Sequence, residues 1–157
     1  MKVFVANDAG YCFGVRDAVD LAYQTANKRG GVFMLGDIVH NENVVNNLNK
    51  SGTKVVQSLD QIPESEPVLF RAHGTSTQVW KKAKDKNMNI IDATCPLVSK
   101  VHAEVQMHSK SGKECILIGH AHHPEVEGTL GQYDTINGGA IYLIQSKEEA
   151  ERLNVKN

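Results

Sequence analysis

The sequence predicts an α/β fold in which small parallel sheets are joined by crossover helices. Short apolar runs of strand type alternate with amphipathic helical patterns along the chain. Glycine and proline mark many of the boundaries, and no low-complexity tract or Gly/Ser linker interrupts the alternation. Strands that alternate with helices pair in parallel, because each crossover helix returns the chain to the edge of the sheet where it started.

The first half of the chain has the clearest periodicity. Residues 2–7 form an apolar run that predicts a strand. Over residues 14–29, apolar side chains recur at helical spacing until Gly30 and Gly31 end the pattern. Similar patterns predict strands at 32–35, 54–57, 68–72 and 89–92, and helices at 43–50 and 75–87, the second with Ser76 as its N-cap.

The second half continues the same alternation. Pro96 fits the first turn of a helix over 97–109, which Gly112 ends. Strands are expected at 115–118 and 140–144, and helices at 123–130 and 147–153. The DATCP segment can join two successive βαβ layers, and a single continuous doubly wound sheet is the alternative.

Composition narrows the class of protein. The chain has 157 residues, of which 41% are hydrophobic and 22% charged, with a formal net charge of −1. This balance does not suggest a nucleic-acid or membrane partner, and no window approaches the roughly 20 apolar residues of a membrane span. Three cysteines are an odd and sparse set, unlike a secreted disulfide framework, so a cytoplasmic location is expected.

Cys12 and Cys95 each follow a predicted strand and precede a predicted helix. Open α/β sheets bind ligands beyond the carboxyl ends of their strands, and the positive end of a helix stabilises a thiolate. Gly10 and Gly14 flank Cys12 and let the backbone approach a bulky inorganic or phosphate group. Both thiols are therefore candidates for metal binding or reaction, against the alternative that they are inert. Cys115, inside an apolar strand, is expected to fill the core.

His40, His73 and His123 also follow predicted strands. Imidazole N–H groups, hydroxyls and helix N-termini together suit an anionic ligand such as phosphate, although a single loop histidine is more often only solvated. Glu125 lies at the start of the following helix, where it can relay protons to a substrate or simply complement the helix dipole. His102, inside a helical pattern, is expected to pack or to face water.

The motifs AGYCFGV, IVHN, AHGTS, DATCPLV and GHAHHPEVEGT together resemble the LytB/IspH family, the 4-hydroxy-3-methylbut-2-enyl diphosphate reductases. The resemblance runs from the first predicted strand to about the last predicted helix. Members of this family remove the allylic hydroxyl of 4-hydroxy-3-methylbut-2-enyl diphosphate, giving isopentenyl and dimethylallyl diphosphate. This is the last step of the non-mevalonate (MEP) isoprenoid pathway.

The resemblance implies a cofactor and a role for each candidate residue. Cys12 and Cys95 match two of the three family cysteines that hold a 4Fe–4S iron–sulfur cluster, and the third ligand lies outside this chain. An external one-electron donor, such as ferredoxin or flavodoxin, is implied as a partner. The remaining matches are the histidines of the diphosphate pocket, His40, His73 and His123, and the proton-delivering glutamate, Glu125.

The resemblance also implies a domain organisation. The family fold has three similar α/β domains around a central cluster. Residues 1–95 would form the first domain and residues 96–157 an incomplete second domain, with the third absent. The chain alone is then expected to be an inactive fragment.

Two other classes of function remain open from the residues. A zinc-dependent hydrolase could use Cys12, Cys95 and one histidine as ligands, because tetrahedral zinc accepts mixed sulfur and nitrogen sets. A non-catalytic domain could instead use the histidines to bind phosphorylated ligands.

Overall fold

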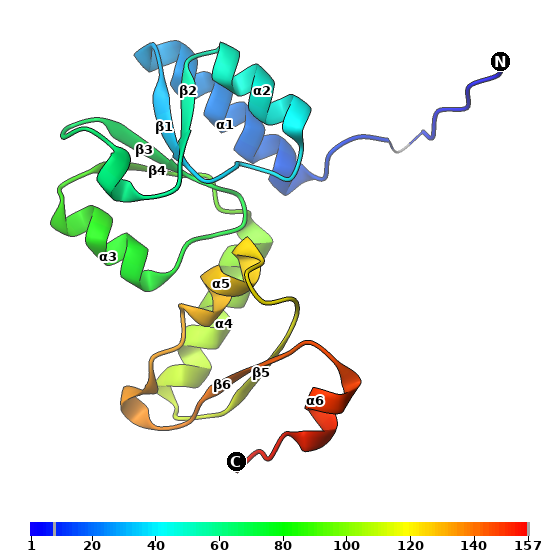
Figure 1. The fold of residues 1–157 in the computed structure, drawn as a ribbon, viewed down its shortest axis with the longest axis vertical. Coiled ribbons are helices and arrows are strands. Elements are labelled where there is room, and N and C mark those ends of the chain that lie inside the picture. Colours follow the sequence, from blue (N-terminus) through cyan, green and yellow to red (C-terminus); the bar gives the residue numbers. More distant parts are fainter. Residues whose placement is uncertain (8, 157) are drawn as a thin grey trace.

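Two separate parallel sheets organise the chain, one before Cys95 and one after it (Figure 1). A computed structural model describes residues 1–7 and 9–156. The first sheet has four strands in the order β2-β1-β3-β4, and the second pairs β5 with β6. These sheets confirm the predicted α/β class and replace the alternative of one continuous sheet. The strands are β1 (Val32–Leu35), β2 (Thr53–Val56), β3 (Pro67–Phe70), β4 (Asn89–Asp92), β5 (Cys115–Ile118) and β6 (Ile141–Ile144).

The helices lie within a few residues of their predicted positions. Asn41, Ser76 and Ser146 cap three of them, each accepting a hydrogen bond from a backbone N–H in the first turn. Two short 3-10 turns, Leu59–Gln61 and Thr135–Asn137, lie in loops where the sequence predicted no element. The helices are α1 (Phe13–Arg29), α2 (Glu42–Lys50), α3 (Thr77–Asp85), α4 (Pro96–Lys110), α5 (Pro124–Leu130) and α6 (Lys147–Arg152).

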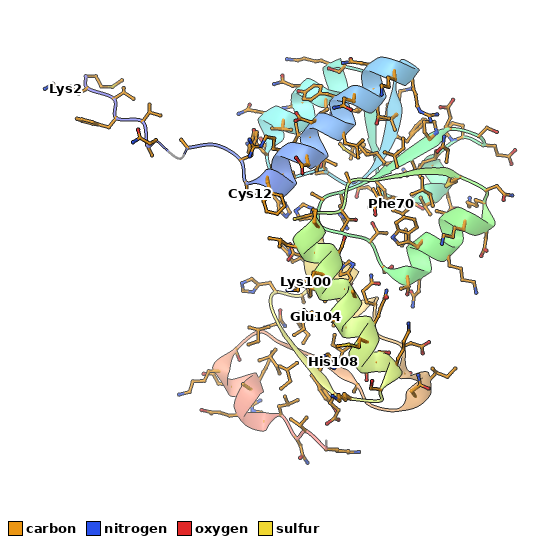
Figure 2. The ribbon with its side chains drawn as sticks, turned by 180° about the vertical axis from the view of Figure 1, so that it is seen from behind. Lys2, Cys12, Phe70, Lys100, Glu104 and His108 are labelled. Atoms are coloured by element: carbon orange, nitrogen blue, oxygen red, sulfur yellow. The ribbon has the colours of Figure 1, made fainter. Side chains whose placement is uncertain are left out.

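The strand predicted at residues 2–7 is wrong. This segment forms no strand and runs away from the body of the protein, with every one of its residues exposed (Figures 1 and 2). Val3, Phe4 and Val5 are 71%, 90% and 77% exposed. A strand needs a neighbour to accept its hydrogen bonds, and no strand of the described residues pairs with this segment. Cys12 therefore precedes α1 without following a strand.

In the four-stranded sheet, the order in which successive strands are added reverses direction at β1. From β1 the chain moves outward to β2, then crosses back to place β3 on the other side of β1. Open α/β sheets bind ligands at such a point of reversal, beyond the carboxyl ends of the two central strands, which here are β1 and β3.

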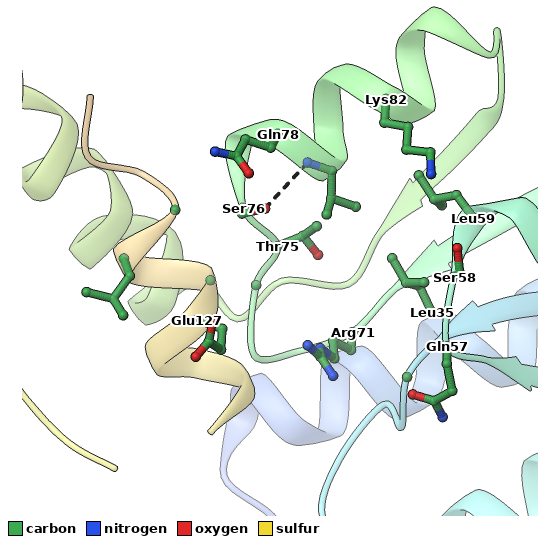
Figure 3. Close-up of a pocket in the computed structure, with 16 residues that line it drawn as sticks. Leu35, Gln57, Ser58, Leu59, Arg71, Thr75, Ser76, Gln78, Lys82 and Glu127 are labelled. Carbon is green, nitrogen blue, oxygen red and sulfur yellow. Dashed lines mark hydrogen bonds between the residues drawn. The ribbon is translucent and has the colours of Figure 1, made fainter. Parts of the chain in front are cut away.

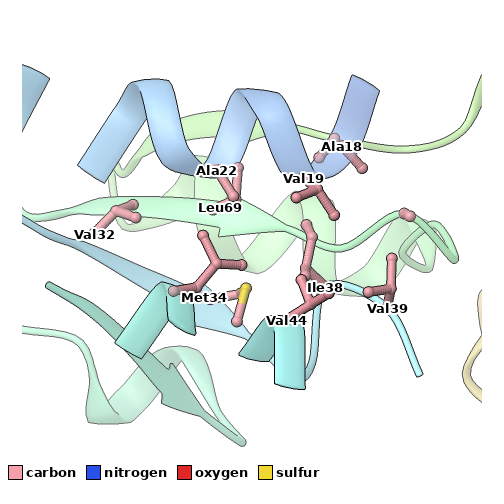
Figure 4. Packing of buried hydrophobic residues seen from close by; sticks show 12 residues of the cluster. Ala18, Val19, Ala22, Val32, Met34, Ile38, Val39, Val44 and Leu69 are labelled. Atoms are coloured by element: carbon pink, nitrogen blue, oxygen red, sulfur yellow. The ribbon is translucent and has the colours of Figure 1, made fainter. Parts of the chain in front are cut away.

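Apolar side chains fill both faces of this sheet, as a parallel sheet requires. Met34 and Leu69 face α1 and α2, in the cluster that Figure 4 shows. Val68 and Phe70 face the opposite side, where Phe70 packs edge-on against Trp80 of α3 with ring centroids 5.0 Å apart. All four residues of the central strand β3 are buried. The loops that leave β3 and β1 thus start from the best-packed part of the chain.

Helix α4 starts directly after Cys95 and leads into the second sheet (Figure 1). Helix α5 packs beside α4 and returns toward the loop that follows β3. Among the described residues, no helix is both long and apolar enough to span a membrane.

We expect Leu69→Ala to lower the free energy of unfolding by about 2–5 kcal/mol, because it leaves a cavity beneath α1 and α2. Urea unfolding followed by circular dichroism measures the change. Phe4→Ala is the control, since its side chain is 90% exposed and its loss should change stability by less than about 0.5 kcal/mol. Equal effects of the two substitutions would contradict this packing.

Candidate ligand site at the strand ends

Backbone hydrogen bonds continue past the ends of three adjacent strands and align the loops that follow them. Ala72 N–H donates to Ile38 O at 3.2 Å, which links the loop after β3 to the loop after β1. Cys95 N–H donates to Ala72 O at 3.0 Å, which adds the segment after β4. His40 lies two residues after Ile38, and His73 directly follows Ala72. These bonds therefore bring two predicted site histidines and one predicted cysteine to the same edge of the sheet.

The three predicted histidines come together at this edge. The ring centroids of His40 and His73 are 4.3 Å apart, and those of His40 and His123 are 5.1 Å apart. His73 and His123 lie 5.9 Å apart with their ring planes at 90°. Three imidazoles within this distance form one polar surface, contributed by the loops after β1, β3 and β5. We call these three side chains the histidine cluster.

His123 has a second role as the N-cap of α5. Its Nδ1 accepts a hydrogen bond from Glu125 N–H at 3.3 Å. A neutral imidazole that accepts at Nδ1 carries its proton on Nε2. The cap thus leaves an Nε2–H donor available to a ligand. Glu125 itself is exposed in the first turn of α5, two residues from the cluster.

His73 is held neutral by its surroundings. Burial lowers its pKa to about 4, and the neighbouring His40, Arg71 and His123 shift it in the same direction. Its Nδ1 is buried and has no hydrogen-bond partner among the described residues. A buried polar atom without a partner is costly, so His73 is the member of the cluster whose polar group is not satisfied by the described residues.

The two predicted cysteines lie at the starts of two long helices. Cys12 is the N-cap residue of α1, and Cys95 is the N-cap residue of α4. Figure 2 shows Cys12 at the end of α1 that faces α4. Gly14, two residues after Cys12, lies so close to Cys95 that a Cβ on Gly14 would overlap Cys95 Sγ. Both thiols are free and belong to one region, with Cys12 exposed and Cys95 half-buried.

The spacing of the donor side chains bears on the zinc alternative. Within residues 1–7 and 9–156, no three His, Cys, Asp or Glu side chains come together as they would around a metal ion. The zinc alternative requires such a set from Cys12, Cys95 and a histidine, and the geometry gives it no support. Two free thiols at positive helix ends, beside a glycine that leaves room, do fit part of the ligand set of a larger group.

Close contact between α5 and the loop after β3 fixes His123 relative to His73. Gly128 packs against the backbone of Gly74, and a Cβ on Gly131 would overlap Ser76 Cβ. Gln132 Nε2 donates to Thr75 O at 3.0 Å across the same contact. Glycine and a buried amide thus permit an approach that larger side chains would prevent.

Two side chains outside the predicted site lie near the histidine cluster. His102 was expected to pack or face water, and it packs: it is 9% exposed and lies against Gly74. Arg71 was not among the predicted site residues, yet its positive charge acts on His73. Its position two residues before His73, in LFRAHG, was the available signal. Cys115 was expected to fill the core, but it is half-buried in β5 and belongs to neither apolar cluster of the first sheet; burial raises its pKa.

A parallel sheet with imidazoles converging at its point of reversal, beside thiols at two helix starts, defines an α/β protein with a strand-end site for a polar ligand. The sequence model of the family described as "LytB protein" matches residues 3–157. The chain therefore belongs to the LytB/IspH family of 4-hydroxy-3-methylbut-2-enyl diphosphate reductases, as its motifs indicated.

Curated relatives agree with this assignment. The chain is 47% identical over 156 residues to the 4-hydroxy-3-methylbut-2-enyl diphosphate reductase of Hahella chejuensis, covering 99% of this chain and 49% of the relative. It is 46% identical over 158 residues to the reductase of Azotobacter vinelandii, covering 100% of this chain and 50% of the relative. The chain thus spans about half the length of the curated relatives it matches.

Two solved structures share the fold. The E-1-hydroxy-2-methyl-but-2-enyl-4-diphosphate reductase of Plasmodium falciparum superimposes with a TM-score of 0.89 at 33% identity, covering 96% of this chain and 46% of that chain. A second structure is described as (E)-4-hydroxy-3-methyl-but-2-enyl diphosphate reductase, the terminal enzyme of the non-mevalonate pathway. It has a TM-score of 0.78 at 36% identity, covering 94% of this chain and 52% of that chain.

We expect the effect of Gly14→Ala to depend on Cys95. With Cys95 present, the added methyl meets Sγ and should lower the free energy of unfolding by about 1–2 kcal/mol. In a Cys95→Ala background the obstacle is gone, and alanine should be neutral or stabilising because it favours the helix more than glycine. Urea unfolding of the four proteins tests this cycle. The same loss in both backgrounds would mean that the two residues do not touch.

We expect the His73 ring to titrate near pH 4 when followed by NMR. Between pH 6.5 and 4 the unfolded chain takes up this proton before the folded chain does, so the free energy of unfolding falls as the pH is lowered through this window. His40→Asn should raise the midpoint but leave it below 6.5, because burial is the larger cause. A midpoint near 6.5 in the unsubstituted chain would contradict the described environment.

Proposed function

We propose that this chain supplies part of the active site of an iron–sulfur reductase that removes the allylic hydroxyl of 4-hydroxy-3-methylbut-2-enyl diphosphate. The products would be isopentenyl and dimethylallyl diphosphate, formed in the last step of the non-mevalonate isoprenoid pathway. The observation that carries the proposal is the histidine cluster, with ring centroids 4.3–5.9 Å apart next to the Cys95 segment. Because the relatives are about twice as long, the complete activity is proposed for a protein that contains this chain.

The histidine cluster binds the diphosphate in this proposal. Imidazole donors from three loops can reach separate oxygens of one diphosphate group, and His123 has its Nε2–H free for this purpose. The negative ligand would favour protonation of His73, which strengthens the hydrogen bonds it makes. Binding through the diphosphate leaves the hydroxyl end of the substrate to extend toward the thiols.

Cys12 and Cys95 are the proposed ligands of the iron–sulfur cluster from this chain, and a third cysteine would come from outside it. A 4Fe–4S cluster held by three thiolates would supply electrons, received singly from an external donor such as ferredoxin or flavodoxin, and an open iron for the substrate hydroxyl. Both cysteines lie at helix starts, where the partial positive charge of α1 and α4 favours an anionic group such as the proposed iron–sulfur cluster.

Glu125 is the proposed proton donor. The reaction consumes two electrons and two protons, breaks the allylic C–O bond and releases the oxygen as water. Glu125 lies in the first turn of α5, and its backbone N–H binds the His123 ring, so the α5 cap sets its position relative to the diphosphate site. In this organisation, residues 1–95 and 96–157 contribute as successive domains.

A chimera tests the proposal, with this chain joined to the half of the Azotobacter vinelandii reductase that it does not match. We expect it to reduce 4-hydroxy-3-methylbut-2-enyl diphosphate after anaerobic reconstitution with iron and sulfide. Glu125→Gln should lower kcat about 100-fold or more with little change in KM, because it removes the proton donor. His123→Asn should instead raise KM. Glu104→Gln, an exposed carboxylate on α4, is the matched control and should leave both constants unchanged.

Three outcomes would overturn the proposal. Cys12→Ser and Cys95→Ser chimeras that still assemble a full complement of iron and sulfide would remove both thiols from the ligand set. Stoichiometric zinc with no iron, in protein purified without oxygen, would favour the hydrolase instead. Tight calorimetric binding of a diphosphate analogue to the metal-free chimera, without any turnover once reconstituted, would favour a binding domain.

A further inference from the structure

A groove of about 600 Å³ lies between the end of the four-stranded sheet, α3 and α5 (Figure 3). Polar side chains from several elements line it, including Arg71, Thr75, Ser76, Gln78 and Glu127. None of the cluster histidines, Cys12, Cys95 or Glu125 is among its lining residues. The groove therefore adjoins the site proposed for the reductase substrate but has a different lining, and its volume is typical of small-molecule sites.

Arg71 is the unusual feature of this groove. Its side chain is half-buried, and its guanidinium lies over Gly36, where an added Cβ would come within 2.6 Å of Nη1. Burial lowers the pKa of Arg71, and the charge of Asp37 opposes the shift. Among the described residues, no carboxylate lies within ion-pair distance of this guanidinium, and no hydrogen bond to it is found.

The other charged side chains that line the groove already have partners. Lys82 Nζ lies 2.5 Å from Asp60 Oδ2, in an exposed ion pair. Glu127 Oε1 accepts a hydrogen bond from His122 N–H at 3.2 Å. Figure 3 shows Arg71 extending into the space between Glu127 and Leu35. Arg71 is left as a cation with several unused N–H donors inside a concave surface.

We propose that this groove is a second anion-binding site, in which Arg71 holds the phosphate or carboxylate group of a small ligand. A partly desolvated guanidinium is costly when unpaired, and its planar fork matches two oxygens of an oxyanion. Ser76 Oγ accepts from Val79 N–H, so its hydroxyl proton is free to donate to the same ligand. Thr75, buried at the groove wall, contributes a second hydroxyl.

Titration of the ¹⁵N-labelled chain with inorganic phosphate tests the proposal by NMR. We expect saturable shifts of the Arg71 Nε–H resonance and of the Thr75 and Ser76 amides. A parallel titration with acetate identifies the source of the oxyanion: tighter phosphate binding indicates a phosphorylated ligand, and tighter acetate binding a carboxylate. Arg71→Gln should weaken binding at least about tenfold, because it removes charge-assisted hydrogen bonds. Arg71→Lys keeps the charge without the fork and should bind with intermediate affinity.

Matched variants separate this groove from its surroundings. Lys81→Gln removes a positive charge from an exposed position of the same helix, α3, that does not line the groove, so phosphate affinity should change less than about twofold. His123→Asn disrupts the histidine cluster and should leave the Arg71 shifts in place. The His123→Asn titration therefore distinguishes phosphate binding in the groove from phosphate binding at the proposed substrate site, since each site could bind phosphate without the other.

Three results would overturn the proposal. Phosphate shifts confined to the histidine cluster would show that it is the anion site. If folded Arg71→Gln binds phosphate with unchanged affinity, Arg71 does not contact the anion. If the shifts never saturate and neither anion is preferred, the groove binds an adventitious ion only. If Arg71→Gln does not fold, the Arg71→Lys titration and the Arg71 Nε–H shift decide the matter.

Discussion

The hydrogen bonds from Ala72 to Ile38 and from Cys95 to Ala72 hold the loops of three adjacent strands in register. Each loop carries a proposed site residue, so the geometry of the site depends on this backbone ladder rather than on contacts between the site side chains. The ladder in turn depends on β3, which is buried on both faces. Because the packing of β3 already fixes where these loops start, the loops lose less conformational entropy when a ligand binds.

Much of this arrangement follows from local sequence patterns. The β4 and β5 strands have the predicted bounds, because short apolar runs between breakers leave little freedom in placing a strand. Residues 2–7 have the same pattern but form no strand, since pairing needs a partner that local sequence does not specify. His40 and His73 lie close together because β3 pairs with β1 on the side opposite β2. His123 joins them because α5 contacts the loop after β3. The strand order and this helix contact are both set by packing between segments that are distant in the sequence.

The enclosure of Arg71 depends on contacts between segments that are distant in the sequence. An arginine at the end of an apolar strand is usually solvent-exposed, with its charge in water. Here Arg71 is enclosed because α5 packs against the loop after β3. This contact needs the small residues Gly128 and Gly131, and glycine in a sequence does not by itself indicate which segment packs against it. The same enclosure places one positive charge between two polar sites, where it acts on His73 from one side and faces the groove on the other.

Helix α4 connects the strand ends of the first sheet to the second sheet, so a small tilt of this helix produces a large displacement at its far end. The helix has 15 residues, and at a rise of 1.5 Å per residue it is about 22 Å long. Cys95 caps its first turn, and the loop after β3 contacts both α5 and the first two turns of α4, through Gly128 and His102, so the residues after Cys95 are attached to the first sheet at one end of α4. Any rotation about this end moves the far end of α4 much further than the attachments themselves. A tilt of about 5° would carry the far end of α4 about 2 Å while leaving the attachments almost still.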